Sequence, residues 1–427
     1  MSVKRLTILH INKVHHMLGG AESVYFTTSE LLERHGHKSI FFSVRHPCNT
    51  PTETEGYFAP YIDLNKNKGL FNHIKASLNV FYSFKSRKHL ARLLDNYTVD
   101  IAHIHNIHRQ MSPSILHELK RRGIPIIMTL HEYKMICPSF LLLAHGKPCE
   151  ACSNGRYYNA IRRRCVKGRF MRSLLASLEA YLHFKIMDIY KNVDIFIVPS
   201  LFLMRKHEEM GFKGRMVHLP YPLDLRRYDR FKSSCISCGD DRIRIAYFGR
   251  LVKEKGLLTL TDAIVSLSRK GMEQDVEFSI IGEGQLRKEM EDRLRGEGIK
   301  NVNFMGFLLG DSLYEEIAKM HIIVIPSEWY ENYPVSVMEA FAMGKPVIGS
   351  NIGGIPEFVK HKDTGLIFKA GNSNDLCEKI EYLVKNKEEI TRMGKNARSF
   401  AERVFDAELH YPRLIEIYGE VMRRHEP

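Results

Sequence analysis

Two glutamates, eight residues apart, carry the clearest chemical pattern in the sequence. Glu331 lies in a polar and aromatic loop, and Glu339 lies about one turn inside the helix that we expect to follow this loop. Carboxylates accept hydrogen bonds from vicinal hydroxyl groups. One of the two glutamates could therefore bind a ribose and the other a hexose. The alternative for Glu339 is a solvated side chain beside an ordinary helix start.

The junction between the loop and the helix is suited to a phosphate group. Asn332, Tyr333 and Pro334 lead into the helix, which begins near Val335 and Ser336. Backbone amides around these residues, together with the helix dipole, can hold phosphate oxygens. Pro334 has no amide hydrogen, which is tolerated because the first helical amides lack an intrahelical partner. A sugar joined to a nucleotide fits this combination of amides and carboxylates.

The elements around the two glutamates are predicted from hydrophobic pattern and glycine placement. The apolar run 322–325 has the length and β-branched content of a buried parallel strand. A helical pattern covers 335–343 and stops at Gly344, and a second short strand follows at 347–349. Such a unit places its loop at the carboxyl edge of a parallel sheet, where α/β proteins bind ligands.

Two basic residues stand at a comparable position earlier in the chain. Arg250 and Lys255 follow a predicted strand at 243–249 and precede a helix. Their charge-assisted hydrogen bonds would suit a diphosphate.

The spacing Glu331-x7-Glu339 after Pro326-Ser327 resembles the signature of the family 4 retaining glycosyltransferases of the GT-B fold. The loop reads Glu-Asn-Tyr-Pro where other members carry Glu-Gly-Phe-Gly. The resemblance implies an α/β protein of two Rossmann-like, doubly wound domains that face each other across a cleft. It also implies that the second domain holds the nucleotide.

The resemblance assigns roles to further residues of the second domain. It implies that Arg250 and Lys255 bind the donor phosphates, and that the backbone at Phe307 and Leu308 reads the base.

In the first domain the resemblance points to a glycine loop and a histidine. Gly19 and Gly20 stand in a Gly-Gly-Ala-Glu sequence, at the place where a family glycine loop faces the donor phosphates and the acceptor. His131 follows the predicted strand 124–130, and the family carries a histidine there that reaches the donor sugar. We therefore take His131 and Glu331 as the candidate catalytic residues, against the alternative that His131 is only structural.

The expected domain boundaries follow from the order of these elements, and the resemblance implies the role of each domain and the return of the last helix. Residues 1–220 form the acceptor-side Rossmann-like domain, with a cysteine-containing insertion at about 133–170. A charged linker at 221–242 leads to the nucleotide-sugar-binding domain at 243–400. The last helix, within 401–427, is expected to cross back to the first domain.

The insertion contains four cysteines whose spacing could hold one tetrahedral zinc. They are Cys137, Cys149, Cys152 and Cys165. A rival arrangement pairs the second Cys-x2-Cys sequence, at Cys235 and Cys238, with the first one. The remaining alternative is a set of reduced thiols without metal. Any zinc would be structural, and no cofactor is expected for catalysis.

A basic run and an apolar helix lie side by side in the same region. Seven lysines and arginines fall between Arg156 and Arg172 with no acidic residue among them. We interpret this cluster as a contact to an anionic bilayer, the alternative being a solvated face. Leucines and an isoleucine repeat at helical spacing over 174–186, and we expect this helix to pack in the core.

Composition limits the remaining choices. The chain of 427 residues has a net charge of +14 and a pI of about 9.3, which favours an anionic partner. No apolar run reaches the length of a membrane span, and the N-terminus reads as a first strand instead of a signal peptide. We expect a cytoplasmic protein that associates peripherally with the inner face of the cell membrane.

Together with these observations, the resemblance implies transfer of a glycosyl group, with retention, from a nucleotide sugar (UDP- or GDP-linked) to a saccharide or lipid-linked acceptor. The expected context is surface polysaccharide biosynthesis, including lipopolysaccharide. No Asp-x-Asp sequence occurs, so a metal-clamped diphosphate is not expected. One alternative is a nucleotide-sugar epimerase or another GT-B enzyme. A different class is a basic, zinc-containing nucleic-acid-binding protein, but aromatic residues are not interleaved with the basic run, and we expect no nucleic acid partner.

Overall fold

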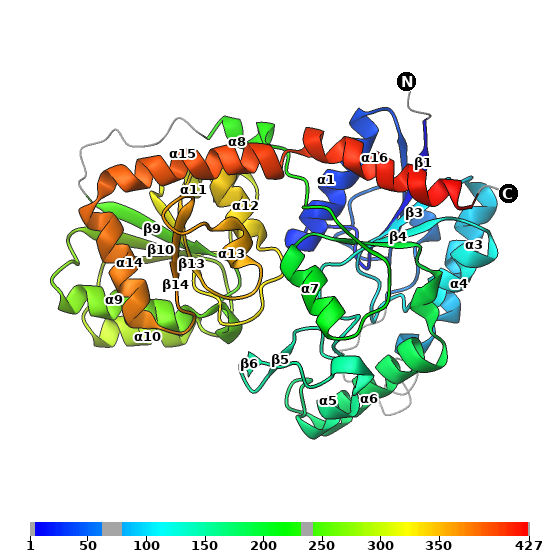
Figure 1. Ribbon diagram of the computed structural model, residues 1–427, viewed down its shortest axis with the longest axis horizontal. Helices are drawn as coiled ribbons and strands as arrows, with labels where there is room; N and C mark the ends of the chain where they lie inside the picture. The colour runs from blue at the N-terminus through cyan, green and yellow to red at the C-terminus, as the bar shows by residue number, and fades with distance from the viewer. Residues whose placement is uncertain (1–4, 62–78, 232–241, 426–427) are drawn as a thin grey trace. The chain divides into compact units, whose positions relative to one another are not determined.

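The computed structural model describes residues 5–61, 79–231 and 242–425 (Figure 1). The rival cysteines Cys235 and Cys238, and much of the expected linker, lie outside the described residues. The chain divides into two compact units. The first comprises 1–145, 149–222 and 407–427, and the second comprises 146–148 and 223–406. We expected the interdomain linker to begin at residue 221 and the segment that crosses back to the first domain to begin at residue 401. The structure instead divides the chain into its two units after Pro222 and after Asp406.

The first unit is built on a six-stranded parallel sheet with the order β2-β1-β3-β4-β7-β8. Its strands are β1 (Thr7–Ile11), β2 (Lys38–Phe42), β3 (Ile101–Ile104), β4 (Ile126–Thr129), β7 (Ile195–Val198) and β8 (Met216–His218). Strands β1, β3, β4 and β7 are buried almost throughout, which explains why they read as continuous apolar runs. The strand order reverses between β1 and β3, so the loops after these strands flank the switch point of the sheet.

The helices of this unit include one from the C-terminal end of the chain. They are α1 (Gly20–Arg34), α3 (Phe84–Asn96), α4 (Ser114–Arg121), α7 (Leu201–Glu209) and α16 (Ala407–Arg423). Leu414, Ile417, Tyr418 and Val421 of α16 are buried in one hydrophobic cluster with Ile8 and other strand residues. The end of the chain therefore completes the core of the first unit.

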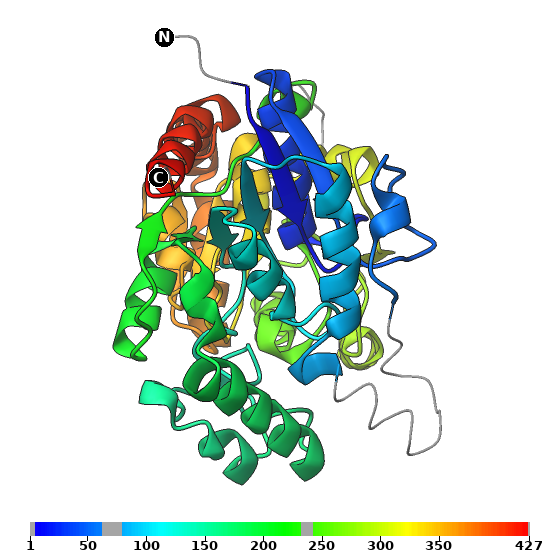
Figure 2. The ribbon, with the colours of Figure 1, turned by 90° about the vertical axis from the view of Figure 1, so that its right-hand side faces the viewer.

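The insertion between β4 and β7 is mostly irregular and ends in helices. It contains the two-residue strands β5 (Leu143–Ala144) and β6 (Lys147–Pro148), then α5 (Tyr158–Arg162) and α6 (Phe170–Tyr181). A π-helical turn, Leu182–Ile186, continues α6. In Figures 1 and 2, α5 and α6 lie beside one another beyond the edge of the first sheet.

The expectation that the apolar helix at 174–186 packs in the core is wrong. Leu178 is 48% exposed and Ile186 is 75% exposed. The buried positions of α6 are instead Ser173, Ser177, Glu179 and Ala180. The helix turns its small and polar residues inward, where hydrogen bonds satisfy them. Of the hydrophobic repeat, Leu178 and Ile186 are therefore exposed, and Leu175 and Leu182 are only partly buried.

The second unit has a six-stranded parallel sheet with the order β11-β10-β9-β12-β13-β14. Its strands are β9 (Ile243–Phe248), β10 (Val276–Ile281), β11 (Val302–Gly306), β12 (Ile322–Ile325), β13 (Val347–Ser350) and β14 (Gly365–Phe368). This is the strand order of a dinucleotide-binding Rossmann fold. Its switch point lies between β9 and β12, which are hydrogen-bonded neighbours.

The helices of the second unit are α8 (Arg226–Asp229), α9 (Leu257–Arg269), α10 (Arg287–Gly296), α11 (Asp311–Lys319), α12 (Val335–Ala342), α13 (Ile355–Phe358), α14 (Ser373–Lys385) and α15 (Lys387–Val404). Helices α9 to α13 alternate with the strands of the second unit, whereas α8 precedes β9 and α14 and α15 both follow β14. The predicted strand at 322–325 and the start of the helix at Val335 are confirmed. None of the helices in the described parts of the chain is long and apolar enough to span a membrane.

Candidate functional site

The loops that follow β9 and β12 place a lysine against a glutamate at the switch point of the second sheet. Lys255 ends a short 3-10 turn, Lys253–Lys255, and Glu331 lies in the loop between β12 and α12. The Lys255 Nζ atom donates to Glu331 Oε1 over 2.6 Å. The Glu331 side chain is 7% exposed and that of Lys255 is 22% exposed, so one face of the lysine remains open to a ligand.

Neighbouring side chains hold Glu331 in its ionised form. Ser327 Oγ donates to Glu331 Oε1 over 2.6 Å, and Trp329 Nε1 donates to the same oxygen over 2.9 Å. Burial by itself would raise the pKa of Glu331, but the charge of Lys255 and these three hydrogen bonds outweigh it and lower the pKa. The site therefore presents a buried carboxylate that is charged and fixed in orientation.

Two glycines allow the backbone around this pair to pack closely. Gly256, directly after Lys255, has a φ of +68°, and a Cβ there would lie 1.7 Å from the Pro326 carbonyl oxygen. Gly353 has a φ of +62°, and a Cβ there would lie 2.5 Å from the backbone nitrogen and oxygen of Glu331. Because the carbonyl of Glu331 also accepts from the Gly354 amide at 2.7 Å, this turn braces the loop that carries the glutamate. The Gly353-Gly354 turn is therefore structural.

Arg250 stands on the same strand end without joining the pair. Its side chain is 64% exposed, and its guanidinium lies 3.8 Å from Glu254. Tyr247 OH donates to the Arg250 carbonyl oxygen over 2.9 Å, which fixes the backbone beneath it. The structure thus leaves the Arg250 side chain accessible to an anion at the end of β9.

Glu339 lies in α12, partly exposed and in a different electrostatic setting from Glu331. Burial raises its pKa to about 7, and the hydrogen bond from Tyr314 OH, at 3.4 Å, only partly opposes this shift. Tyr228 OH in turn donates to Tyr314 OH over 3.3 Å. Among the residues that the structure describes, no basic side chain pairs with Glu339 to hold it ionised, and two tyrosines line its surroundings.

The N-terminus of α12 lies between the two glutamates along the chain. Val335 and Ser336 are partly exposed first residues of the helix, as an anion site would require. Asn332 is buried, and Tyr333 packs its ring on Phe358 at 4.5 Å between centroids. For Tyr333 the structure therefore assigns the side chain to the core and leaves only the backbone to a ligand.

Phe307 and Leu308 follow β11 at the same edge of the second sheet. Phe307 is 61% exposed and Leu308 is partly exposed. Gly306 before them has a φ of +73°, and its carbonyl accepts from the Gly282 amide at 2.7 Å. These contacts fix the turn and leave an exposed aromatic ring beside it.

In the first unit, Gly20 begins α1 and Gly19 is its N-cap. Gly19 has an extended φ of 175°, and a Cβ at this position would meet nothing within 4 Å. Open backbone at a helix start is compatible with a ligand approaching it.

His131 lies just beyond β4, and both of its ring nitrogens are engaged. Tyr221 OH lies 2.6 Å from Nδ1, and His105 Nδ1 lies 2.9 Å from Nε2. Burial, with a smaller contribution from the charge of Lys13, lowers the pKa of His131 to about 3. His131 is therefore neutral near pH 7, and its neighbours fix the orientation of the ring.

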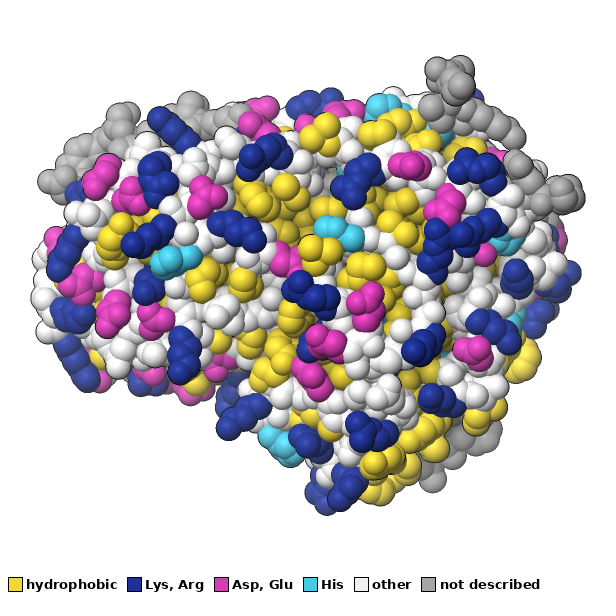
Figure 3. All heavy atoms as spheres, in the orientation of Figure 1, with side chains coloured by type: hydrophobic (Ala, Val, Ile, Leu, Met, Phe, Trp, Pro, Cys, Tyr) yellow, Lys and Arg dark blue, Asp and Glu magenta, His cyan; other side chains and the backbone are white. Residues whose placement is uncertain are grey.

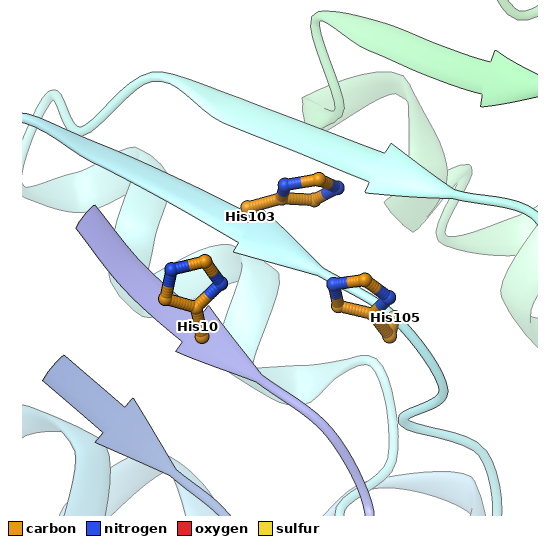
Figure 4. Close-up of side chains that lie close together, drawn as sticks. All are labelled: His10, His103 and His105. Carbon is orange, nitrogen blue, oxygen red and sulfur yellow. The ribbon is translucent and has the colours of Figure 1, made fainter. Parts of the chain in front are cut away.

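Three further histidines, His10, His103 and His105, lie together (Figure 4), and His105 is the one that contacts His131. His10, His103 and His105 each bring a ring nitrogen within 4.8 Å of the others, which no other group of three or more His, Cys, Asp or Glu does in the described residues. The rings of His103 and His105 are stacked 4.6 Å apart at 21°, so their in-plane lone pairs do not converge on one point. Both nitrogens of His103 are already bonded at 2.7 Å, one to Tyr418 OH and one to Thr129 Oγ1. His105 reaches His131 through Nδ1, whereas both ring nitrogens of His10 and Nε2 of His105 have no hydrogen-bond partner among the described residues. The cluster is therefore a buried and only partly hydrogen-bonded group that contacts His131 through His105.

The four cysteines of the insertion lie in one neighbourhood. Burial raises the pKa of the Cys152 thiol to about 12, and the nearby thiols of Cys137, Cys165 and Cys149 add to the effect. Burial and two of the same thiols raise the pKa of Cys165 to about 11. No three of these sulfur atoms lie within 4.8 Å of one another in the described residues. A zinc would have to draw them together, and the zinc site stays a prediction.

Several residues that build the site were not expected from the sequence. Ser327 and Trp329 alternate with Glu331 along one loop, and this i, i+2, i+4 pattern could have indicated that they share a face. Tyr221 and Tyr314 reach their partners from distant segments, and no local signal marks them.

Comparison with known protein families agrees with this architecture. The model for Glycosyltransferase Family 4 matches residues 18–227, and the model for Glycosyl transferases group 1 matches residues 237–400. The expected family membership is confirmed, and the chain belongs to the glycosyltransferases that these two models describe.

Curated relatives are found at moderate identity. The α-D-kanosaminyltransferase of Streptomyces kanamyceticus is 26% identical over 43% of this chain and 47% of the relative. An uncharacterised 42.6 kDa protein in the cps region of Klebsiella pneumoniae is 27% identical over 82% of this chain and 87% of the relative. The amylovoran biosynthesis glycosyltransferase AmsK of Erwinia amylovora is 28% identical over 41% of this chain and 44% of the relative. Apart from the Klebsiella protein, the matches to these relatives span about half of their length or less.

Solved structures with the same fold cover nearly the whole chain. Sucrose-phosphate synthase from Thermosynechococcus elongatus has a TM-score of 0.72 at 18% identity, covering 98% of this chain and all of that one. Anabaena HepE, solved in complex with UDP-glucose, has a TM-score of 0.61 at 16% identity, covering 97% of this chain and all of that one. The two parallel-sheet units are the two Rossmann-like domains of the GT-B fold.

Proposed function

We propose that this protein is a retaining glycosyltransferase that moves a hexosyl group from a nucleotide sugar to a hydroxyl of a saccharide or lipid-linked acceptor. The donor is linked to UDP or GDP, and the reaction serves the synthesis of a surface polysaccharide such as lipopolysaccharide. The 2.6 Å contact between Lys255 and Glu331 at the switch point of the second sheet carries this proposal.

The contact supports a role in which the Lys255 ammonium binds two anions, the Glu331 carboxylate and the donor diphosphate. A lysine ammonium has three N–H donors, and Glu331 occupies one of them. The others can bind the donor diphosphate on the exposed side of Lys255. Glu331, charged and held by Ser327 and Trp329, can then accept from a hydroxyl of the sugar joined to that diphosphate.

The chemistry follows from charge that develops on the leaving group. When the bond between the anomeric carbon and the phosphate oxygen breaks, negative charge grows on the diphosphate. Lys255, Arg250 and the N-terminus of α12 supply fixed positive charge and amide donors for it. Charge-assisted hydrogen bonds contribute roughly 1.5–3 kcal/mol each, so losing either basic side chain should lower the rate about tenfold or more.

The ribose and base are assigned to neighbouring parts of the same unit. Glu339 binds the ribose hydroxyl groups, and the backbone at Phe307 and Leu308 contacts the base. In the first unit, His131 and the backbone at Gly19 and Gly20 address the donor sugar, its phosphates and the acceptor. His131 is neutral and so does not attract the phosphate charge, and a sugar hydroxyl would bind the ring by replacing its contact with Tyr221 or His105.

The comparisons support the donor class and the biological context. Anabaena HepE, which has the same fold, is solved in complex with UDP-glucose. The Klebsiella pneumoniae relative is described as a protein in the cps region. The named activity of AmsK, amylovoran biosynthesis, belongs to that protein and supports the same context here.

A panel of UDP- and GDP-linked sugars tests the proposal. The protein should release nucleoside diphosphate from one donor, slowly by hydrolysis alone and faster with an extract of lipid-linked saccharides. The product should keep the anomeric configuration of the donor, as read by NMR. Release from no donor, or an inverted product, would contradict the proposal.

A further inference from the structure

Helix α6 turns its hydrophobic side to solvent, in contrast to an ordinary surface helix. Phe170 is 50% exposed, Met171 60%, Leu178 48% and Ile186, in the π-helical turn that follows, 75%. These are four of the exposed large hydrophobic side chains of the described residues, and all fall within seventeen positions of the chain. A local concentration of exposed apolar side chains of this kind marks an interaction site.

The inward side of α6 is fixed by polar contacts. Ser177 Oγ donates to the Tyr157 carbonyl oxygen over 2.8 Å. Glu179 accepts from Lys134 Nζ over 2.8 Å in an ion pair with both side chains buried. Since these groups would lose their partners if α6 rotated, the hydrophobic side cannot turn inward at low cost. The exposed orientation is therefore built into the fold of the insertion.

A basic surface surrounds the hydrophobic side chains. Seven exposed lysines and arginines lie on α5, on α6 and in the segments beside them; they are Arg156, Arg162, Arg163, Arg164, Lys167, Arg169 and Arg172. Among the described residues, none of the seven forms an ion pair. The sequence has no acidic residue from Ala151 to Leu178. Figure 3 shows basic and hydrophobic side chains side by side at the lower end of the molecule, where Figure 1 places α5 and α6.

The charge decides which partner fits this surface. A second copy of the chain would bring two uncompensated basic clusters together, which opposes self-association through this face. An anionic lipid surface offers negative charge for the arginines and an apolar layer for the hydrophobic side chains. We propose that the α5–α6 face, formed by these seven basic and four hydrophobic residues, docks on an anionic bilayer with the hydrophobic side chains inserted at the headgroup level.

The two kinds of residue make separable contributions to such docking. Basic residues at an anionic surface contribute about fivefold each in affinity, and salt weakens this part because exposed charges are screened. The inserted side chains contribute a part that salt does not remove. Docking would therefore be reversible and would hold the first unit at a surface that carries lipid-linked saccharides.

Co-sedimentation with vesicles tests the proposal without donor or acceptor, so its outcome is independent of the transfer reaction. The full chain should bind vesicles of phosphatidylglycerol and phosphatidylcholine at least about tenfold more tightly than vesicles of phosphatidylcholine alone. Reversing Arg162, Arg163 and Arg164 to glutamate should abolish most of this difference and flatten the dependence on salt. Replacing Met171, Leu178 and Ile186 by glutamine should weaken binding but keep the salt dependence.

Matched variants control for net charge and for lost hydrophobic surface. Lys288, Arg295 and Lys300, changed together to glutamate, alter the net charge equally on the second unit and should leave binding unchanged. Leu409→Gln removes an equally exposed hydrophobic side chain from α16 and should also have no effect. Thermal unfolding of each variant reports whether it folds.

Three results would overturn the proposal. The wild-type chain could bind both vesicle types equally, or neither of them, which requires no variant to interpret. The control triple could weaken binding as much as the arginine triple. Finally, the glutamine variants could convert a dimer to a monomer without affecting vesicle binding, which would assign the face to a second copy of the chain.

Discussion

The ammonium of Lys255 lies 2.6 Å from Oε1 of Glu331, so the residue expected at the phosphate and the residue expected at the sugar form one ion pair. The contact joins loops 76 residues apart in the chain, at the reversal of strand order in the second sheet. Any change to one partner is therefore felt by the other, and the roles of the two residues have to be separated by experiment.

Replacing Glu331 by glutamine should lower turnover more than nucleotide binding. The substitution keeps the shape of the side chain but removes the charge that Lys255, Ser327 and Trp329 hold in place. We expect kcat to fall at least about tenfold, while the affinity for nucleoside diphosphate changes less than about threefold, because the freed Lys255 still binds phosphate. Steady-state kinetics together with calorimetric titration separates the two quantities.

Glu328→Gln is the matched control for this substitution. Glu328 lies three residues earlier in the same loop, where Oε1 accepts from Thr259 Oγ1 over 2.6 Å. Its replacement should leave kcat within about twofold of wild type. An equal loss of kcat in both variants would mean that the loop, and not the Glu331 carboxylate, is what matters.

Glu339 should make donor binding depend on pH around neutrality. Burial raises its pKa to about 7, and a ribose hydroxyl donates best to the ionised form. We expect the affinity for UDP-glucose to rise about tenfold from pH 6 to pH 8, since the ionised fraction rises by that factor. UDP-glucose is the suitable probe because its diphosphate diester does not titrate in this range. In Glu339→Gln the pH dependence should disappear, whereas Glu315→Gln on α11 should retain it.

The same shift predicts a trend in stability. The folded state holds a proton on Glu339 between about pH 4.5 and pH 7, whereas the unfolded state has released it. The contribution of this group to stability is therefore fully present below about pH 4.5 and is lost as the pH rises through 7. Thermal unfolding should show that the stability of Glu339→Gln increases relative to that of wild type as the pH rises across this window. A constant difference at all pH values would contradict the raised pKa.

The cysteines of the insertion should bind about one zinc per chain. Cys137, Cys149, Cys152 and Cys165 would supply a tetrahedral thiolate site, and the metal would stabilise the irregular backbone that precedes α5. Metal analysis of protein purified without chelator should find the zinc, and Cys137→Ser should lose it. Cys377→Ser, outside the insertion, is the control and should keep it. Protein without zinc, or zinc retained in Cys137→Ser, would exclude this site.

The strands and the loop of the two glutamates could be predicted because their signals are local. An apolar run such as 322–325 predicts a buried parallel strand wherever it occurs, and glycine at position 344 marks the end of α12. The sequence marks Glu331 as a candidate residue but does not predict the side chains that surround it. Its partners Ser327 and Trp329 are local, whereas Lys255 depends on how the sheet brings two loop ends together.

Features that depend on tertiary contacts could not be predicted. A hydrophobic repeat on a helix normally indicates a buried face, but Ser177 and Glu179 find buried partners and turn α6 the other way. Likewise His131 reads as a lone histidine at a strand end. Its orientation comes from Tyr221, ninety residues further along the chain, and from His105 on the neighbouring strand's end.

Lys255 is proposed to hold the diphosphate of a nucleotide sugar, and titration of nucleoside diphosphates measures this contact. Calorimetry with UDP and GDP should show binding of at least one of them to the wild-type chain. Lys255→Ala should weaken that binding about tenfold or more, and Lys253→Ala, two residues away in the same turn, should leave it unchanged. Binding of neither nucleotide, or equal binding to wild type and Lys255→Ala, would contradict the account.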